Sequence, residues 1–197
     1  MTATPQSPDP VLHVLAGPNG AGKSTFATRI LVPATGLPFV NADVIAAELW
    51  PDPGEAEKHA YDAVRLAADE RARRMDERTS FITETVFSHP SKVDLLTGAA
   101  AAGYHVYLHV ILLPEVATVH RVAHRVHQGG HSVPEEKVRE RYQRLWPLVA
   151  QARDVADRSR FYDNTVAKTP FRTVATYEHG RLVGEADWPP WTPDALR

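Results

Sequence analysis

Short apolar runs alternate with longer segments of helical periodicity along most of this chain. The apolar runs are bounded by glycine, proline or polar residues, a pattern typical of buried strands. They lie at residues 11–16, 38–41, 80–86 and 104–113, and a final hairpin is predicted over residues 171–177 and 181–183. Strands that alternate with helices predict a mostly parallel sheet with helices on both faces.

The segments between these strands carry apolar residues at spacings of three and four, which predicts helices. The expected helices span residues 22–31, 43–50, 55–78, 90–102, 116–128 and 134–158. Proline interrupts the hydrogen-bond ladder of a helix. We therefore expect Pro33 to stop the first helix and Pro147 to kink the last one.

The same pattern divides the chain into three parts. Residues 1–10 hold three prolines and no apolar pattern, which predicts a disordered lead. Residues 11–185 are expected to form a single domain, and residues 186–197 an irregular tail. No run approaches the roughly 18 apolar residues of a membrane span, and the first residues do not resemble a secretory signal. We therefore expect a cytoplasmic protein with no membrane partner.

The composition narrows the class of protein further. The 197 residues are 43% hydrophobic and 23% charged, which is typical of a soluble globular domain and not of a disordered chain. A net charge of −2 argues against an electrostatic nucleic-acid binder. Since the chain has no cysteine, disulfides, Cys-ligated zinc and thiol nucleophiles are excluded.

The strongest chemical signal is the segment Gly-Pro-Asn-Gly-Ala-Gly-Lys-Ser at residues 17–24, which fits G-x-x-x-x-G-K-S/T completely. It follows an apolar strand and opens a helix, which is the context of a phosphate-binding P-loop. Backbone N–H groups of such a loop contact phosphate oxygens, the lysine reaches the β- and γ-phosphates, and the hydroxyl ligates Mg²⁺. We expect ATP to be bound by Gly17, Pro18, Asn19, Gly20, Ala21, Gly22, Lys23, Ser24 and Thr25, with Ser24 as the Mg²⁺ ligand.

Two carboxylates follow predicted strands. Asp43 comes directly after the second strand, and Glu84 lies at the end of the third. Ligands of open α/β sheets bind beyond the carboxyl ends of the strands, so both should face the crevice that holds the P-loop. Asp43 could accept a proton from an attacking hydroxyl or hold Mg²⁺ through water, and Asn41 or Asp43 could instead cap a helix. Glu84 could bind substrate hydroxyls, lie near the metal, or simply face solvent.

Arginines flank a Gly-Gly turn in the second half of the chain. Arg121 and Arg125 precede Gly129-Gly130, and the helix after this turn carries further arginines at positions 139, 141 and 144. Two such helices over about residues 114–145 could form a lid that brings guanidinium groups onto a transferring phosphoryl group. The alternative is an exposed helical hairpin whose arginines pair with neighbouring glutamates.

Taken in order, these segments resemble the zeta-toxin family of P-loop kinases. The resemblance rests on the P-loop, on Asn-Ala-Asp43, on Thr-Glu84-Thr, on Gly103-Tyr-His-Val-Tyr-Leu, on Arg125-Val-His-Gln-Gly-Gly-His131-Ser-Val-Pro, on Arg139-Glu-Arg-Tyr142 and on Asp163-Asn164. It covers about residues 11–165, and its most specific part is the segment from Arg125 to Tyr142.

The resemblance implies an α/β fold of the P-loop nucleotide-kinase type, with about five strands, a C-terminal hairpin and an arginine-bearing helical lid. It implies transfer of the ATP γ-phosphoryl group to a hydroxyl of a sugar nucleotide, UDP-N-acetylglucosamine in the first place, and an antitoxin protein as a possible partner. Lys23, Asp43, Arg125 and Arg141 would be catalytic, with Arg121 or Arg139 as alternatives for either arginine. The acceptor would contact Asn41, Asp43, Glu84, Thr85 and His131.

Two other functions compete with a kinase. A nucleotide-dependent ATPase or binding switch would hydrolyse ATP slowly and respond to a protein partner. A nucleic-acid-processing ATPase is disfavoured by the near-neutral charge.

Overall fold

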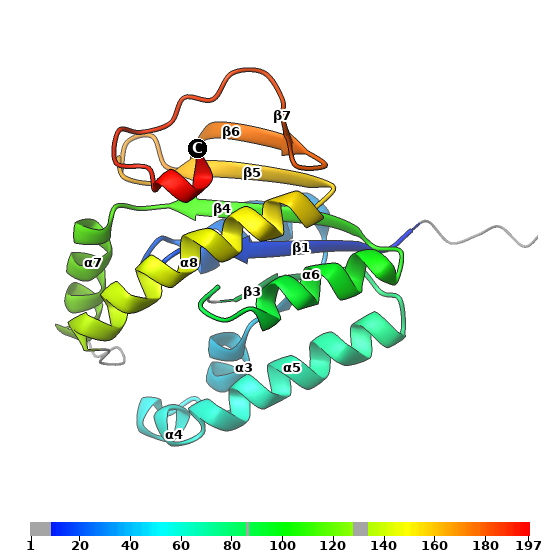
Figure 1. The fold of residues 1–197 in the computed structure, drawn as a ribbon. Helices are drawn as coiled ribbons and strands as arrows, with labels where there is room; N and C mark the ends of the chain where they lie inside the picture. The colour runs from blue at the N-terminus through cyan, green and yellow to red at the C-terminus, as the bar shows by residue number, and fades with distance from the viewer. Residues whose placement is uncertain (1–8, 86, 128–133) are drawn as a thin grey trace, which may run out of the picture.

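A computed structural model describes residues 9–85, 87–127 and 134–197 (Figure 1). Most of the expected disordered lead therefore lies outside the described residues, as do Val86, Gly129, Gly130 and His131. Of the described helices, none is both long enough and apolar enough to cross a membrane.

One sheet forms the centre of the structure. Its strands are β1 (Val11–Ala16), β2 (Phe39–Val40), β3 (Phe81–Glu84), β4 (His105–Leu112), β5 (Arg158–Asp163), β6 (Arg172–Glu178) and β7 (Arg181–Leu182). They lie in the order β2-β3-β1-β4-β5-β6-β7; the first five are parallel, and β6 and β7 are antiparallel to their neighbours. The predicted fold class, a mostly parallel sheet ending in a hairpin, is confirmed.

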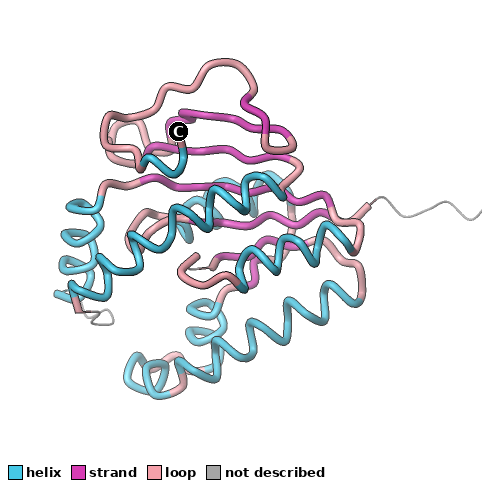
Figure 2. The backbone as a smooth tube through the Cα atoms, viewed as in Figure 1, coloured by secondary structure: helices cyan, strands magenta, loops and turns pink. Residues whose placement is uncertain are grey.

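Helices connect the strands and cover both faces of the sheet (Figure 2). They are α1 (Lys23–Phe26), η1 (Ala27–Leu31), α2 (Val32–Thr35), α3 (Ala42–Leu49), α4 (Pro53–Lys58), α5 (Ala60–Asp76), α6 (Ser91–Ala101), α7 (Glu115–His127), α8 (Glu135–Val155) and η2 (Asp194–Leu196). Helices α6 and α8 cross in front of the sheet in Figure 1.

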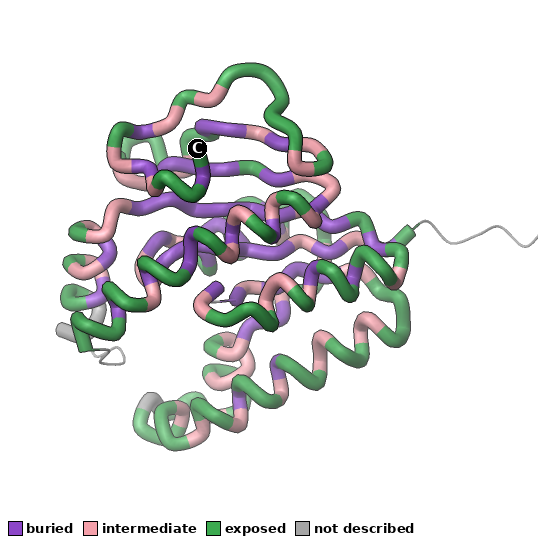
Figure 3. The backbone as a smooth tube through the Cα atoms, viewed as in Figure 1, coloured by how far each residue is buried: buried purple, intermediate pink, exposed green. Residues whose placement is uncertain are grey.

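The buried side chains form two clusters, one on each face of the sheet. Alternate residues of β4 show the division: Leu108 and Val110 belong to the cluster under α6 and α8, whereas Ile111 belongs to the cluster under α1 and η1. Figure 3 shows the central strands as the most continuous buried part of the chain. The irregular tail also contributes to the core, since Leu196 is fully buried in the first cluster.

The first helix does not stop at Pro33, contrary to the prediction. Its second turn, η1, is π-helical, and the chain then continues as α2 to Gly36, which ends it in a left-handed conformation with φ 69°. Pro33 lies in the first turn of α2, directly after the π-helical turn, and lacks the N–H of an ordinary helical hydrogen bond. The change of helical register therefore accommodates the proline.

Two further helix predictions were wrong in their bounds. The segment 55–78 is divided at His59 into α4 and α5. The last long helix ends at Val155, and Arg158, expected to be helical, begins β5. This strand was not predicted because its first three residues, Arg-Ser-Arg, carry no apolar signal, although Ser159 is fully buried between β4 and β6.

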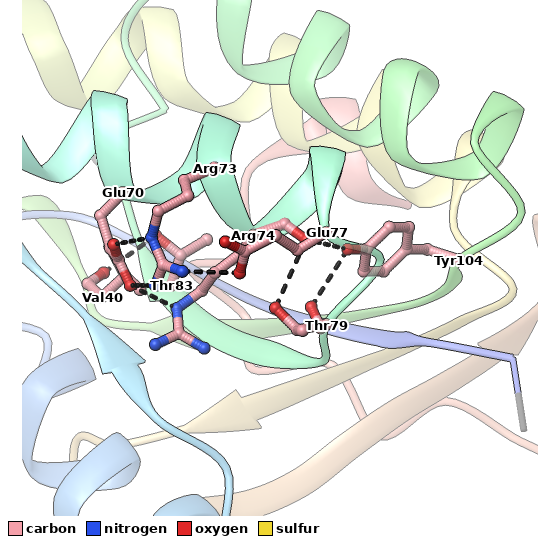
Figure 4. Close-up of polar contacts among 8 residues, drawn as sticks. All are labelled: Val40, Glu70, Arg73, Arg74, Glu77, Thr79, Thr83 and Tyr104. Carbon is pink, nitrogen blue, oxygen red and sulfur yellow. Dashed lines mark hydrogen bonds and ion pairs between the residues drawn. The ribbon is translucent and has the colours of Figure 1, made fainter. Parts of the chain in front are cut away.

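Polar contacts fix the end of α5 against the sheet (Figure 4). The hydroxyl of Tyr104 lies 2.8 Å from the carbonyl oxygen of Arg74 and 3.0 Å from that of Thr79. Glu70 accepts hydrogen bonds from both Arg73 and Arg74. The Glu70 contacts lie within α5, and the Tyr104 contacts hold the chain where it leaves α5 and turns back into β3.

Candidate active site

The P-loop has the backbone that phosphate binding requires. β1 leads into Gly17, whose φ is 144°, and a Cβ at this position would lie 2.4 Å from the backbone oxygen of Ile111. Gly22 caps α1 in a left-handed conformation with φ 95°. Because side chains are excluded at these points, the loop keeps its backbone close to β4 and turns directly into α1.

The functional side chains of the loop converge on Glu84. Ser24 Oγ donates a hydrogen bond of 2.6 Å to Glu84 Oε2, and Lys23 Nζ lies 3.4 Å from Glu84 Oε1. Lys23 is buried, and its ammonium also donates to the carbonyl oxygen of Pro18 at 3.1 Å. β3 lies beside β1, so the strand pairing itself brings the Glu84 carboxylate to the P-loop.

Asn41 connects this cluster to α3. Its Oδ1 accepts hydrogen bonds from the backbone N–H groups of Asp43 and Val44, which makes it the N-cap of the helix. Its Nδ2 donates to Glu84 Oε2 at 3.0 Å. The carboxylate of Asp43 is not used for capping; Asp43 is exposed in the first turn of α3.

The P-loop, Asp43 and Glu84 line one cavity of about 670 Å³. Its wall includes Asn19, Lys23, Ser24, Asp43 and Glu84 at the P-loop end, and it continues between α3 and the α4–α5 segment. The structure therefore brings together the loop and the two carboxylates. Thr85 is placed differently: it is buried, and its backbone N–H donates to Leu15 at the end of β1.

Arg121 and Asn164 support the P-loop from outside. The Arg121 guanidinium donates to the carbonyl oxygens of Gly20, at 3.2 Å, and Asn164, at 2.9 Å. Asn164 Nδ2 donates to the carbonyl oxygen of Ala21 at 2.8 Å. From the sequence, Arg121 is only one of several candidate phosphate ligands, and Asn164 enters only as part of the resemblance. Their contacts with the loop join residues 101 and 143 positions apart, so no local sequence pattern indicates them.

A comparison with protein families decides the classification. A family model named AAA_33, described as an AAA domain, matches residues 12–148. The chain belongs to this family of AAA domains.

Solved structures show that this AAA domain has the fold of P-loop kinases. The AvrRxo1-ORF1:-ORF2 complex with ATP matches at a TM-score of 0.68 and 17% identity, over 89% of this chain and 60% of that one. The PezAT chromosomal toxin–antitoxin system of Streptococcus pneumoniae matches at 0.59 and 13%, over 88% and 74%. A protein assigned as a kinase from Chloroflexus aurantiacus matches at 0.52 and 19%, over 66% and 75%. No curated protein sequence gives a significant match.

The other arginines predicted to contact phosphate differ in their surroundings. Arg139 forms ion pairs with Glu115, at 2.8 Å, and Glu135, at 2.7 Å. Arg141, on another face of α8, is half-buried, and its guanidinium makes no hydrogen bond or ion pair with another described residue. The side chain of Arg125 and all of His131 lie outside what the structure describes.

The expected lid is partly fixed by packing. Tyr142 and Leu145 of α8 belong to the core cluster on the front of the sheet. The second half of the segment 114–145 therefore cannot move as a unit without exposing apolar surface.

A chain of polar rings, the half-buried His13 and the buried His109 and Tyr162, lies under α1, on the face of the sheet opposite α8. His13 Nδ1 lies 3.0 Å from His109 Nε2, and His109 Nδ1 lies 3.3 Å from the hydroxyl of Tyr162. Phe26 of α1 packs against His109 and Tyr162 with ring centroids 5.6 and 4.7 Å apart. Burial lowers the pKa of His109 to about 3 and that of His13 to about 4.

Proposed function

We propose that this AAA domain is an ATP-dependent kinase that acts in the cytoplasm and phosphorylates a hydroxyl group of a small molecule. The observation that carries the proposal is the shape of the cavity. It holds the P-loop and Asp43 together and then extends between α3 and α5, which gives room for an acceptor beyond the phosphates. Simple ATP hydrolysis would need no such space.

The P-loop residues from Gly17 to Thr25 would hold the phosphates of ATP through backbone N–H groups and the Lys23 ammonium. Ser24 Oγ and the Glu84 carboxylate are adjacent hard oxygen donors, the type of ligand that Mg²⁺ prefers, so these residues fit the metal. When bound there, Mg²⁺ would neutralise charge on the β- and γ-phosphates.

Asp43 would act as the base for the acceptor hydroxyl. As the acceptor oxygen bonds to the γ-phosphorus, the bond from that phosphorus to the β,γ-bridging oxygen breaks and ADP leaves with that oxygen. The hydroxyl proton passes to the Asp43 carboxylate. Its exposure on the cavity wall supports this role, because capping of α3 is already performed by Asn41.

Arginines would stabilise the charge on the transferring group. Among the alternatives, Arg141 is favoured over Arg139, since Arg139 is already held by two glutamates. Arg125 remains the second candidate by its place in α7. Arg121 acts instead on the P-loop backbone in this structure, so we assign it a supporting role.

The resemblance to zeta toxins makes UDP-N-acetylglucosamine the first acceptor to test, with Asp43 and Glu84 on the cavity wall as its contacts. Asn41 would act on it only through Glu84, and Thr85 does not line the described cavity wall. An antitoxin-like protein is a candidate partner, since the similar AvrRxo1 and PezAT structures are described as a two-component complex and a toxin–antitoxin system. A nucleotide-dependent switch acting on a protein is the competing function.

The test is transfer of label from [γ-³²P]ATP to acceptors. We expect Asp43→Asn to lower acceptor phosphorylation roughly 100- to 10,000-fold while ATP binding persists. Lys23→Ala should lower both, and Glu48→Gln, an exposed carboxylate on the same helix, should lower neither. Unchanged phosphorylation by Asp43→Asn would refute the assignment of the base. ATP turnover that ignores small acceptors and responds to an added protein would favour the switch.

A further inference from the structure

The wall of the cavity is polar at the P-loop and becomes apolar with distance from it. Its remaining wall is made of small or apolar side chains from α3, α4, α5 and the loop between α3 and α4. Figure 1 shows α3 and α4 beside the adjoining end of α5. These residues are Ala42, Ala46, Ala47, Trp50, Pro51, Ala56, Ala60, Ala63 and Val64. Six alanines leave open space where larger side chains would fill it.

The charged residues of the wall lie together at the other end. Among the described residues that line the cavity, the ionisable ones are Lys23, Asp43 and Glu84. Lys23 is committed to the nucleotide and to Glu84. An acceptor lying along the groove would therefore meet two carboxylates and, beyond them, only uncharged side chains of the described wall.

Trp50 provides an aromatic surface in this wall, and a neighbouring ring holds it in place. Its ring stacks on His59, with centroids 4.4 Å apart and an interplanar angle of 8°. His59 stands at the junction of α4 and α5, and its Nδ1 lies 3.0 Å from Asp62 Oδ2. Trp50 is part of the described cavity wall, whereas His59 is not. His59 therefore packs against the face of the indole ring that is turned away from the cavity.

We propose that the acceptor of this kinase is an uncharged alcohol whose body is a planar ring that packs on Trp50. This inference rests on the proposed kinase function and narrows its acceptor class. It points away from the sugar nucleotide that the resemblance favours.

Electrostatics supports the choice of an uncharged body. Proteins bind phosphate groups with arginine, lysine or clustered backbone N–H groups, because an anion taken out of water must be compensated. A diphosphate lying along this groove would instead face alanines and the carboxylates of Asp43 and Glu84. A flat apolar ring loses little on leaving water and gains contact with an indole ring that is already fixed.

The experiment compares matched acceptors with the full chain, [γ-³²P]ATP and Mg²⁺. The neutral ring-bearing panel is the four ribonucleosides and 2-phenylethanol; UDP-N-acetylglucosamine is the anionic counterpart of uridine, and glycerol is a neutral alcohol without a ring. We expect at least one member of the neutral panel to be phosphorylated with a higher kcat/KM than UDP-N-acetylglucosamine and glycerol.

The variants place that acceptor in the groove. Loss of an aromatic stacking surface should raise the acceptor KM at least about fivefold in Trp50→Ala, with recovery in Trp50→Phe. Ala60→Leu, which fills the groove without removing a side chain, should raise the acceptor KM as well. Ala72→Leu, exposed on the same helix and outside the described wall, should not. The KM for ATP should stay constant in all four variants.

The outcomes separate the two hypotheses. If UDP-N-acetylglucosamine has the highest kcat/KM and Asp43→Asn abolishes its phosphorylation, the proposed acceptor class is wrong. The proposed kinase function is then supported. An acceptor KM that ignores Trp50→Ala and Ala60→Leu would also overturn it. If ATP is bound but no acceptor of either class is phosphorylated, the proposed kinase function fails, and this inference fails with it.

Discussion

Acid should destabilise this protein through the His13–His109 pair. The two rings lie 3.0 Å apart, and His109 also contacts the hydroxyl of Tyr162. Burial, together with the nearby charges of His13 and Arg160, lowers the pKa of His109 to about 3. Burial alone lowers the pKa of His13 to about 4. Both imidazoles are therefore neutral in the folded protein at pH 5.

The sign follows from comparison with the unfolded chain, where a histidine titrates near pH 6.5. Below that pH the unfolded chain binds protons that the two rings do not bind in the folded protein. The stability that the neutral rings contribute is therefore fully present above pH 6.5. It is lost progressively as the pH falls towards 4 and then 3. At pH 5, protonation of the unfolded chain lowers the free energy of unfolding by about 2 kcal/mol per ring, or about 4 kcal/mol for the pair. That is a large part of the roughly 5–15 kcal/mol by which a domain is stable.

Urea unfolding followed by circular dichroism at pH 7 and pH 5 measures this loss. The double variant His13→Gln with His109→Gln should lose much less stability between the two pH values than the wild type. His105→Gln, an exposed histidine at the start of the same strand β4, should keep the wild-type loss. An equal loss in the double variant and the wild type would refute the reasoning. The comparison uses changes within each variant, so a lower stability of the double variant at pH 7 does not affect it.

Three further predictions concern the P-loop and its neighbours. Gly17→Ala should abolish ATP binding in calorimetry, since its Cβ would lie 2.4 Å from the Ile111 oxygen; retained affinity would contradict this. Glu84→Gln keeps the size of the side chain but removes its charge, and should weaken Mg²⁺-dependent ATP turnover by roughly 10- to 100-fold in a Mg²⁺ titration. Arg121→Ala should raise the KM for ATP about tenfold by releasing two backbone carbonyls. Arg139→Ala, which removes exposed ion pairs, should change that KM little, and equal effects of the two variants would argue against a special role for Arg121.

The sequence allowed the fold class and the P-loop to be predicted because both depend on local signals. A strand, a glycine-rich loop and a helix follow one another within residues 11–31, and the chemistry is contained in eight of those residues. The positions of Asp43 and Glu84 could be predicted for a related reason. Parallel strands end at the same edge of a sheet, so residues that follow different strands meet there.

What could not be predicted depends on partners distant in sequence. β5 carries Arg158 and Arg160 among its six residues, and its position is determined by β4 on one side and β6 on the other. The supporting contact of Arg121 with Gly20 spans 101 positions, and nothing local distinguishes this arginine from its neighbours. Passage of the helix through Pro33 required a π-helical turn, which has no simple sequence pattern.

Asn41 links the two carboxylates of the site, Asp43 and Glu84. One end of its amide caps α3 and so fixes the first turn, where Asp43 stands; the other end donates to Glu84, which contacts Ser24 and Lys23. The acceptor side and the nucleotide side of the cavity are therefore joined through one short side chain. Because an amide offers both a donor and an acceptor, asparagine can make both contacts at once, whereas aspartate could cap the helix but would repel Glu84. The two contacts together account for an amide, and not a carboxylate, two residues before Asp43.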